Sequence, residues 1–355
     1  MKNKITIIIP THYRVPVVQR SIAYYEPLGI KVIIVDSSKT PLQINGLNNI
    51  TYLHNPDMDF AKQISRGLEL VETPYACLCA DDDFLSISGV QSGVEFLDAN
   101  LDYVTVQGTY IQFVLNSKIL TYNLLYDGFQ NYTVAEDDPS ARVIHAFEHG
   151  MSNLYALYRT PVLRSAMNLA CSVREVTVVE TSTNLVGNIY GKHTTLPVFW
   201  MARDSARYSD YVTIEGHKWN KKSILDEKIP PAILIDNWDI YLKSTAGKIL
   251  KEGFSKLFSS VTGESEFIAG QAFDAAFSAY IRKQIHKKNK KETIKIAPFI
   301  KHFLKKILPV IIIDWKRIKR QNRIKLPGYP SNSIKAQQDW NLMTTVIKSH
   351  PITKK

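Results

Sequence analysis

Residues 75–83 read YACLCADDD, an apolar run that ends in three consecutive aspartates. An uninterrupted short apolar run is typical of a strand buried on both faces of a parallel sheet. Carboxylates this close raise one another's pKa, and a divalent cation removes the repulsion. Taken alone, the aspartates fit a solvated turn or a helix N-cap equally well. The strand in front of them favours a site for Mg²⁺ or Mn²⁺, which prefer hard oxygen ligands.

The elements upstream of this strand alternate between β and α patterns. Runs rich in Ile and Val at 4–9 and 31–36 predict strands, and 50–53 predicts a third. Apolar residues at helical spacing over 15–25 and about 60–71 predict the helices between them. This order predicts a doubly wound α/β sheet. The polar loops after its strands then share the carboxyl edge, where such folds bind ligands.

The pattern beyond the aspartates is more helical. We expect helices at 90–97, 161–169, 180–190 and across 235–281, strands within 103–115, a strand at 154–158, mixed loop over 121–150, and irregular structure over the last thirty residues.

Cysteine usage and the N-terminus bear on the compartment. Three cysteines cannot form a fully paired disulfide framework, and Cys77 and Cys79 lie in the apolar strand, so we expect a reducing compartment. The apolar run at 5–9 is too short for a signal peptide and lacks a small-residue cleavage site. No stretch reaches the roughly 18 apolar residues of a spanning helix. We predict a cytoplasmic protein, either free or peripheral on the inner face of the membrane.

The charge of the chain is concentrated near its C-terminus. The net charge is +11, but residues 282–325 alone carry 16 Lys and Arg against Glu292 and Asp314. The rest of the body is mildly acidic, so we expect no nucleic-acid partner. Apolar residues interleave with the cations, which predicts a basic amphipathic segment suited to an anionic membrane surface. A packing helix with a solvated charged face is the alternative.

Four segments, in order, resemble the family-2-like glycosyltransferases of the GT-A fold. ITIIIPTHYR at 5–14 resembles their first strand and loop, and VIIVDSS at 32–38 resembles their second strand, whose last Asp reads the nucleotide base. The segment from Asn55 to Leu68 is similar to the part leading into their acidic motif. Residues 75–85 look like their strand and D-x-D element. The resemblance covers about residues 4–100.

The resemblance implies a GT-A fold, which is a Rossmann-like, mostly parallel sheet flanked by helices. It also implies a nucleotide-sugar donor and Mn²⁺ or Mg²⁺ as cofactor. One position departs from the family pattern. If Asp82 and Asp83 are the last acids of the usual D-x-D-D, Ala80 replaces the first; if Asp81 and Asp83 form the D-x-D, the loop is offset by one. The implied donor-binding residues are Pro10, Thr11, His12, Arg14, Asp36, Ser37, Lys62, Asp81 and Asp82, and the implied metal ligands are Asp81, Asp83 and His217.

An inverting enzyme of this type needs a carboxylate general base near the acceptor hydroxyl. The family places it at the start of a helix after the acidic motif, where Glu180 is the best candidate; an N-cap role is the alternative. Glu175 and Asp204 are weaker candidates, since an ion pair explains Asp204. A retaining enzyme, the alternative, does not need such a base. Residues 150–153 are either an acceptor loop or a turn.

We therefore predict a metal-dependent, hexosyltransferase-like enzyme that moves a sugar from a nucleotide donor to a glycan or lipid-linked acceptor in bacterial surface polysaccharide synthesis. The alternatives are a nucleotidyltransferase, although 10–14 lacks the glycine of a phosphate loop, and an inactive membrane scaffold. We expect a catalytic domain at 1–235, with a donor half to about residue 100 and an acceptor half at 101–235. A mainly helical extension at 236–355 follows it.

Overall fold

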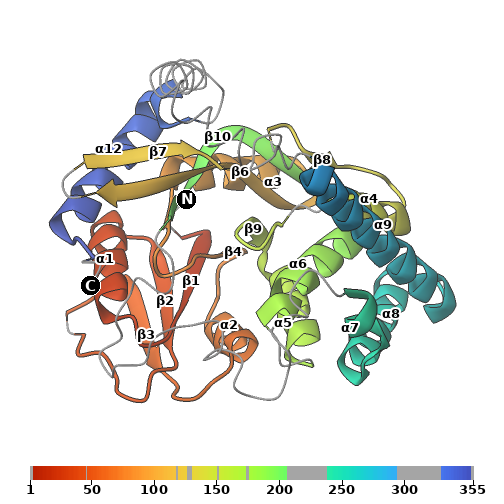
Figure 1. Ribbon diagram of the computed structural model, residues 1–355. Helices are drawn as coiled ribbons and strands as arrows, with labels where there is room; N and C mark the ends of the chain where they lie inside the picture. The colour runs from red at the N-terminus through yellow and green to blue at the C-terminus, as the bar shows by residue number, and fades with distance from the viewer. Residues whose placement is uncertain are drawn as a thin grey trace.

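The computed structural model describes residues 3–44, 46–116, 119–125, 130–149, 152–172, 176–205, 238–293 and 329–352. Its centre is a ten-stranded sheet in the order β3-β2-β1-β4-β9-β6-β10-β5, with β7 paired to β6 and β8 to β10 (Figure 1). The strands are β1 (Ile5–Thr11), β2 (Lys31–Asp36), β3 (Ile50–His54), β4 (Tyr75–Leu78), β5 (Phe84–Leu85), β6 (Tyr103–Asn116), β7 (Ile119–Leu124), β8 (Thr133–Val134), β9 (Leu157–Arg159) and β10 (Lys192–Asp204).

Helices cover both faces of this sheet. The helices are α1 (Val15–Tyr25), α2 (Phe60–Glu69), α3 (Ile87–Ala99), α4 (Pro139–His149), α5 (Thr160–Cys171), α6 (Val176–Tyr190), α7 (Trp238–Lys243), α8 (Thr245–Thr262), α9 (Glu266–Thr293) and α12 (Ile334–Ser349), with short 3₁₀ turns η1 (Glu26–Leu28) and η4 (Pro330–Asn332).

The predicted βαβ start is confirmed. β1 pairs in parallel with β2 and β4, and β2 with β3. Successive residues of β1 belong to different cores: Ile7 and Ile9 pack with α1, α3 and α12, whereas Ile8 packs with α2 and α5. Cys77 and Cys79 are buried as expected. Because both faces of these strands are covered, their sequences are continuously apolar and not alternating.

Beyond β4 the sheet contains both parallel and antiparallel pairs. β9 inserts between β4 and β6 and runs antiparallel to both, and β7 and β8 are antiparallel to their neighbours. β10, which was not predicted, pairs in parallel with β6. Its register shifts between Thr195 and Phe199, around Pro197, which breaks the strand pattern in the sequence.

Two stretches predicted to be irregular are ordered. Residues 121–150 contain most of β7, all of β8 and the helix α4, and the last thirty residues contain α12. In β7 every second side chain faces solvent, so its composition resembles a loop. In α12 the apolar positions are separated by polar ones, and tertiary packing decides the outcome. The strand predicted at 154–158 is the shorter β9, and the helix predicted at 180–190 begins four residues earlier, at Val176.

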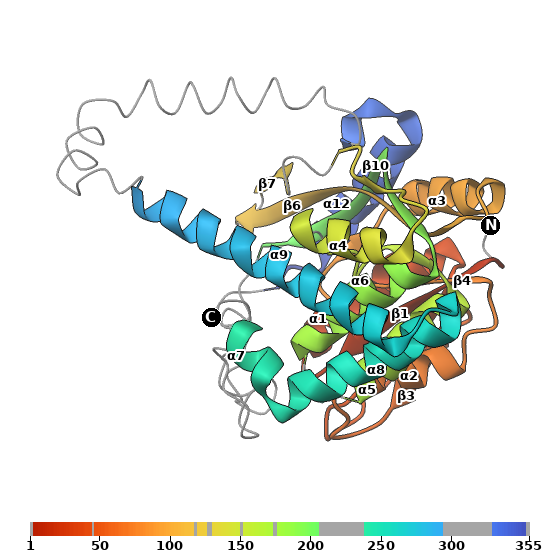
Figure 2. The same ribbon diagram turned by 90° about the vertical axis from the view of Figure 1, so that its right-hand side faces the viewer.

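The C-terminal helices pack against two different parts of the catalytic fold. α9 lies along α4, and α8 packs against α9 and α6 (Figure 2). Four phenylalanines, Phe254, Phe258, Phe273 and Phe277, fill the contact between α8 and α9. In contrast, α12 packs against α1 and α3 on the other face of the sheet. None of the helices in the described part of the chain is long and apolar enough to cross a membrane.

Arg142 of α4 fixes the end of α6. Its Nε donates to the carbonyl oxygen of Asn188 at 2.8 Å and Nη2 to that of Ile189 at 3.0 Å. Its Nη1 donates to the carbonyl oxygens of Glu136 and Asp137, both at 2.8 Å. The last carbonyl groups of a helix need such partners when they are buried. Arg142 therefore caps the C-terminal end of α6.

Asp339 attaches α12 to the start of α3. Its Oδ2 accepts hydrogen bonds from Ser86 Oγ at 2.6 Å, Ser88 N at 2.8 Å and Ser88 Oγ at 2.7 Å. A carboxylate at a helix N-terminus is favoured by the helix dipole. Beside it, the ring of Trp340 packs against those of Tyr122 and Phe199. The C-terminal helix thus completes the core of the first half of the chain.

We predict that Trp340→Ala lowers the free energy of unfolding by about 3 kcal/mol, because it empties a nearly buried aromatic site. Urea denaturation followed by circular dichroism measures the change. Gln338→Ala on the exposed side of the same helix serves as the control and should change stability by less than about 0.5 kcal/mol. Equal stabilities of the two variants would show that α12 contributes nothing to the core.

Candidate active site

Asp36 is held in place at the carboxyl end of β2. It is 1% exposed, and its Oδ1 accepts hydrogen bonds from Ser38 N at 2.8 Å and Ser38 Oγ at 2.5 Å. Its Oδ2 accepts from the hydroxyl of Tyr52 at 2.7 Å. An aspartate with this many donors points its carboxylate in one direction. Sequence reasoning missed Tyr52, because its contact with Asp36 forms only when β3 pairs with β2.

The loop after β1 lies against the loop after β2. Pro10 and Thr11 pair with Val35 and Asp36 in the ladder, and His12 Nδ1 lies 2.8 Å from the hydroxyl oxygen of Ser37. The next residue, Tyr13, has a φ of 52°, a left-handed conformation that turns the chain sharply into α1. The predicted donor-binding residues of these two loops are therefore neighbours.

Arg14 and Thr11 hold the first two aspartates of the acidic run. Arg14 Nη1 lies 2.6 Å from Asp81 Oδ1, and its Nη2 lies 2.6 Å from Asp82 Oδ2. The hydroxyl of Thr11 donates to Asp81 Oδ2 at 2.7 Å. All four side chains are buried. Arg14 lies at the start of α1, so the fold of the first βαβ unit places its charge at the acidic run.

The third aspartate contacts the end of β10 instead. Asp83 Oδ1 accepts a hydrogen bond from the backbone N–H of Asp204 at 2.9 Å, and Oδ2 lies 3.1 Å from Arg203 Nε. Asp204 itself pairs with Arg20 of α1 at 2.8 Å. The ion pair expected for Asp204 is present, with a partner from a distant element. Sequence reasoning missed Arg20 and Arg203 because β10 was not predicted.

Burial raises the pKa of two carboxyl groups in this run. The pKa of Asp81 rises to about 6 because of burial, an effect that nearby Arg14 opposes. The pKa of Asp83 rises to about 8, because it is buried and lies next to Asp82, with Arg203 opposing the rise. The charged form of Asp83 is therefore less stabilised than that of an ordinary surface aspartate.

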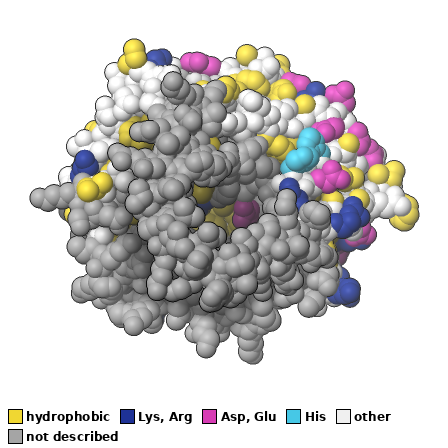
Figure 3. All heavy atoms as spheres, turned by 45° about the horizontal axis from the view of Figure 1, so that its top comes forward, with side chains coloured by type: hydrophobic (Ala, Val, Ile, Leu, Met, Phe, Trp, Pro, Cys, Tyr) yellow, Lys and Arg dark blue, Asp and Glu magenta, His cyan; other side chains and the backbone are white. Residues whose placement is uncertain are grey.

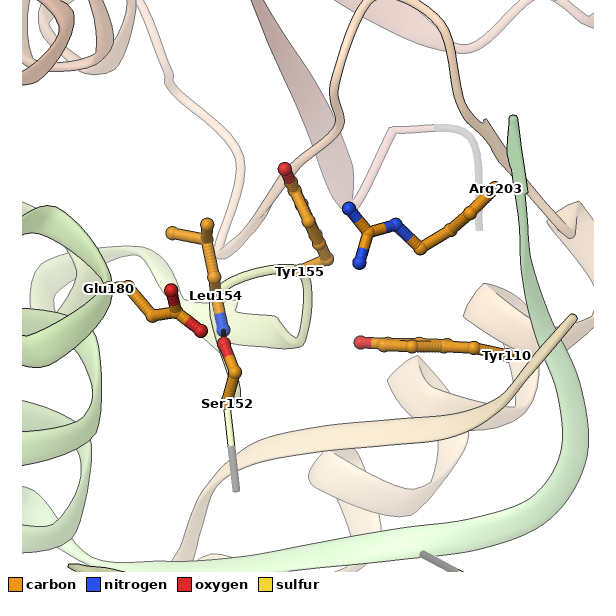
Figure 4. A pocket seen from close by; sticks show the side chains of 6 residues that line it. All are labelled: Tyr110, Ser152, Leu154, Tyr155, Glu180 and Arg203. Carbon is orange, nitrogen blue, oxygen red and sulfur yellow. Dashed lines mark hydrogen bonds between the residues drawn. The ribbon is translucent and has the colours of Figure 1, made fainter. Parts of the chain in front are cut away.

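A cavity of about 160 Å³ lies beside Arg203 and is lined by Tyr110, Ser152, Leu154, Tyr155 and Glu180. In the space-filling view an acidic side chain is visible in a recess at the centre of one face (Figure 3). Close up, Glu180 projects from α6 on one side of the cavity and Arg203 from β10 on the other, with Tyr155 between them in this view and the Tyr110 ring below Arg203 (Figure 4). The cavity thus combines an exposed carboxylate with a guanidinium that contacts the acidic run.

The chain was compared with known proteins. The model of the family described as Glycosyl transferase family 2 matches residues 6–153, which contain both polar loops and the whole acidic run. Residues 6–153 form a family 2 glycosyltransferase domain. No curated protein matches the sequence.

Solved structures similar to this glycosyltransferase include S. aureus TarS 1-349, with 12% sequence identity and a TM-score of 0.43. They also include the same protein in complex with UDP-GlcNAc, with 13% identity and a TM-score of 0.41, and in complex with UDP, with 14% identity and a TM-score of 0.40. Each match covers 80% of this chain and 92% of the TarS chain.

The predicted residues of the glycosyltransferase do not all lie together. Glu180 lines the cavity, but it lies in the second turn of α6 and not at an N-cap, since the helix begins at Val176. Ser152 of the predicted acceptor loop lines the same cavity. Lys62 lies on α2 and pairs with Asp59 at 3.3 Å. The predictions for Glu175 and His217 fall outside the described residues.

Asp82 and Asp83 fit a divalent cation that is bound partly through its substrate. A carboxylate offers about four lone-pair positions, and each of these two keeps acceptor capacity beyond its contacts with Arg14 or Arg203 and Asp204. The described residues contain no group of three His, Cys, Asp or Glu arranged to hold a metal. Phosphate oxygens and waters would complete the shell, as is usual for Mg²⁺. Asp81, like Asp83, has a hydrogen-bond partner on each oxygen, and its metal-binding role stays a prediction.

In the absence of divalent ions, we predict that the stability of the Asp83→Asn variant relative to the wild type increases as pH rises from about 5 to 8.5. Because the folded-state pKa of Asp83 is raised to about 8, folding favours its protonated form. That contribution to stability is complete below the unfolded pKa near 4 and is lost as pH rises through 8. Asparagine cannot ionise and escapes this loss. Thermal unfolding at a series of pH values measures the difference.

Asp98→Asn is the matched control. The pKa of Asp98 is lowered by hydrogen bonds from Lys4 and Tyr75, so this carboxylate is ionised throughout that pH range. The difference in Tm between Asp98→Asn and the wild type should stay constant. If the Asp83→Asn difference stayed constant as well, Asp83 would be an ordinary ionised carboxylate.

Proposed function

We propose that this protein is a metal-dependent glycosyltransferase that moves a sugar from a nucleotide-sugar donor to a glycan or lipid-linked acceptor, in bacterial surface polysaccharide synthesis. The observation that carries the proposal is one continuous set of contacts along the carboxyl edge of the sheet. It runs from Asp36 through the loop of Thr11 to the acidic run, and from Asp83 through Arg203 to the cavity of Glu180. The nucleotide would lie at Asp36, the diphosphate at the acidic run and the acceptor in the cavity of Glu180, which is the order that the transfer requires.

The nucleotide would occupy the edge at β1 and β2. A carboxylate accepts hydrogen bonds, so Asp36 would pair with an N–H on the edge of a base. Its own donors, Ser38 and Tyr52, fix the direction of the carboxylate. The diphosphate would then lie over the acidic run. A Mn²⁺ or Mg²⁺ ion held there by Asp83, with Asp82, would neutralise the charge of the leaving diphosphate.

The cavity between Glu180 and Arg203 is our proposed site of transfer. Glu180 would accept the proton of the acceptor hydroxyl while that oxygen forms its bond to the anomeric carbon. The bond from the anomeric carbon to the diphosphate oxygen breaks in the same step, and the nucleoside diphosphate leaves with the bonding electrons. Arg203 contacts Asp83 and lines the cavity, so its positive charge lies next to the place where the negative charge develops.

The donor can be identified by a screen of sugar nucleotides. Thermal shift with and without Mn²⁺ would reveal binding, and release of nucleoside diphosphate would reveal turnover. The proposal requires that at least one sugar nucleotide raise the Tm more with Mn²⁺ than without it. Release of inorganic diphosphate from a nucleoside triphosphate would instead support a nucleotidyltransferase. Silence with every donor would support an inactive scaffold.

We predict that Glu180→Gln lowers kcat by about 10²- to 10⁴-fold, the usual contribution of a general base, and leaves donor affinity within about threefold. Glutamine keeps the shape of the side chain and cannot take a proton. Steady-state kinetics measure kcat, and calorimetry with the donor found by the screen measures affinity. An unchanged rate would remove Glu180 as the base.

Two control variants accompany Glu180→Gln. Asp83→Asn should abolish metal-dependent turnover together with the Mn²⁺-dependent part of donor binding, whereas Glu180→Gln should leave that binding intact. Glu95→Gln, an exposed carboxylate on α3, should leave both turnover and binding unchanged.

We also propose that residues 282–325 attach the enzyme to an anionic membrane surface. Each Lys or Arg near such a surface contributes about 1 kcal/mol. Deleting the whole C-terminus is a poor test, because α12 packs into the core against α1 and α3. Charge reversal within the segment avoids this problem.

Lys305→Glu/Lys306→Glu should therefore weaken binding to phosphatidylglycerol vesicles by at least about tenfold at low salt. Vesicle sedimentation measures the bound fraction. Lys248→Glu/Lys335→Glu, which changes two exposed lysines elsewhere, should weaken it much less. Equal losses in both double variants would mean that only net charge matters and would refute the segment as the membrane site.

A further inference from the structure

Arg20 is buried between the acidic run and the end of β10. It lies in α1 and is 2% exposed. A single nitrogen, Nη2, donates to the carbonyl oxygen of Asp82 at 3.1 Å and to Asp204 Oδ2 at 2.8 Å. Residue 82 follows β4 and residue 204 ends β10, so this one group joins two segments more than a hundred residues apart in the sequence.

Aromatic rings and a carboxylate surround the side chain of Arg20. Its guanidinium carbon lies 5.4 Å from the ring centre of Phe84 and 5.8 Å from that of Phe113. A buried guanidinium needs a carboxylate partner to offset the loss of its hydration, and Asp204 supplies one. Removing either partner leaves an uncompensated charge in a largely apolar place. The side chain of Arg20 is thus held by Asp204, by the carbonyl group of Asp82 and by two aromatic rings.

The position of Asp83 depends on this pair. The backbone N–H of Asp204 donates to Asp83 Oδ1, and Arg203, one residue earlier, contacts Asp83 Oδ2. Arg20 binds the side chain of Asp204 and also the backbone carbonyl group of Asp82. It therefore holds Asp83 both through the preceding residue and through the end of β10. Arg203 in turn lines the cavity with Glu180. Arg20 thus determines how the acidic run is placed relative to the cavity.

We infer that Arg20 is a positioning residue for sugar transfer, acting through Asp204 on the relative placement of Asp83 and Arg203. Arg20 does not line the cavity of Glu180, and its guanidinium lies against the rings of Phe84 and Phe113. The inference rests on the proposed function, in which the diphosphate lies at Asp83 and the acceptor in the cavity of Glu180. An error of about 1 Å between reacting groups can reduce a rate about 10²-fold. The base pocket at Asp36 has no contact with Arg20 among those described for either residue.

The test is a double-mutant cycle with Arg20→Met and Asp204→Asn in the full-length protein. Methionine keeps the apolar contact with Phe84 and Phe113, and asparagine removes the charge left without a partner. Each single variant should lower kcat by about 10- to 100-fold and change KM for the donor by less than about threefold. The double variant should be no slower than the slower single one, because both act through the same contact. Arg20→Lys, which keeps the charge, should recover most of the rate.

Arg142→Met is the matched control. Arg142 is also a buried arginine that binds backbone carbonyl groups, and it lies away from the acidic run. This variant should lower Tm at least as much as Arg20→Met and leave kcat within about threefold when both are assayed well below their Tm. A purely structural Arg20 would behave as Arg142 does. The same result in both variants, or effects of Arg20→Met and Asp204→Asn that multiply independently, would overturn the inference.

A second readout is binding of Mn²⁺ in the presence of UDP, followed by calorimetry. Arg20→Met should weaken Mn²⁺ binding by about tenfold, whereas Arg142→Met should leave it unchanged, since only the former displaces Asp83. An unchanged Mn²⁺ affinity in Arg20→Met would count against the inference. A wild type that releases no nucleoside diphosphate from any donor would instead refute the proposed function. Turnover in the wild type with equal turnover in Arg20→Met would refute the positioning role alone.

Discussion

The arrangement of the site depends on the compensation of three buried carboxylates by three arginines. Asp81 and Asp82 share Arg14, Asp83 contacts Arg203, and the backbone of Asp82 is held by Arg20. The three arginines come from the start of α1, the body of α1 and the end of β10. Uncompensated, a run of buried aspartates would carry a large cost in free energy. The acidic run can therefore exist only when the first βαβ unit and β10 have both assembled around it.

This requirement links the two halves of the catalytic fold. The parallel strands β1, β2 and β4 bring Asp36 and the acidic run to one edge, as is general for doubly wound sheets. β6 and β10 add the cavity, and α6 presents Glu180 to it. Helices far along the chain then support these elements: α8 and α9 lie behind α4 and α6, and α12 covers α1 and α3.

The sequence predicted the donor half of the fold and its loops well, because strands buried on both faces are continuously apolar and end in recognisable polar loops. Asp36, Thr11 and Arg14 lie where such loops predict. The cavity was only partly predictable: Glu180, a candidate from the family resemblance, lines it, whereas Arg20, Arg203 and Tyr52 act through contacts between distant segments. β10 was missed because Pro197 and a register shift interrupt its pattern. In α12 the polar residues between the buried positions concealed a helix that tertiary packing stabilises.

The attachment of α12 has a consequence for the order of folding during synthesis. Asp339 binds at the start of α3, and Trp340, Met343 and Ile347 are part of the core built on β1 and β2. Domains generally begin to fold from the N-terminus while the ribosome is still adding residues. Here the first βαβ unit lacks part of its core until α12 has left the ribosomal tunnel. The first hundred residues are translated early, yet they reach their final packing only after residues 334–349 have been synthesised.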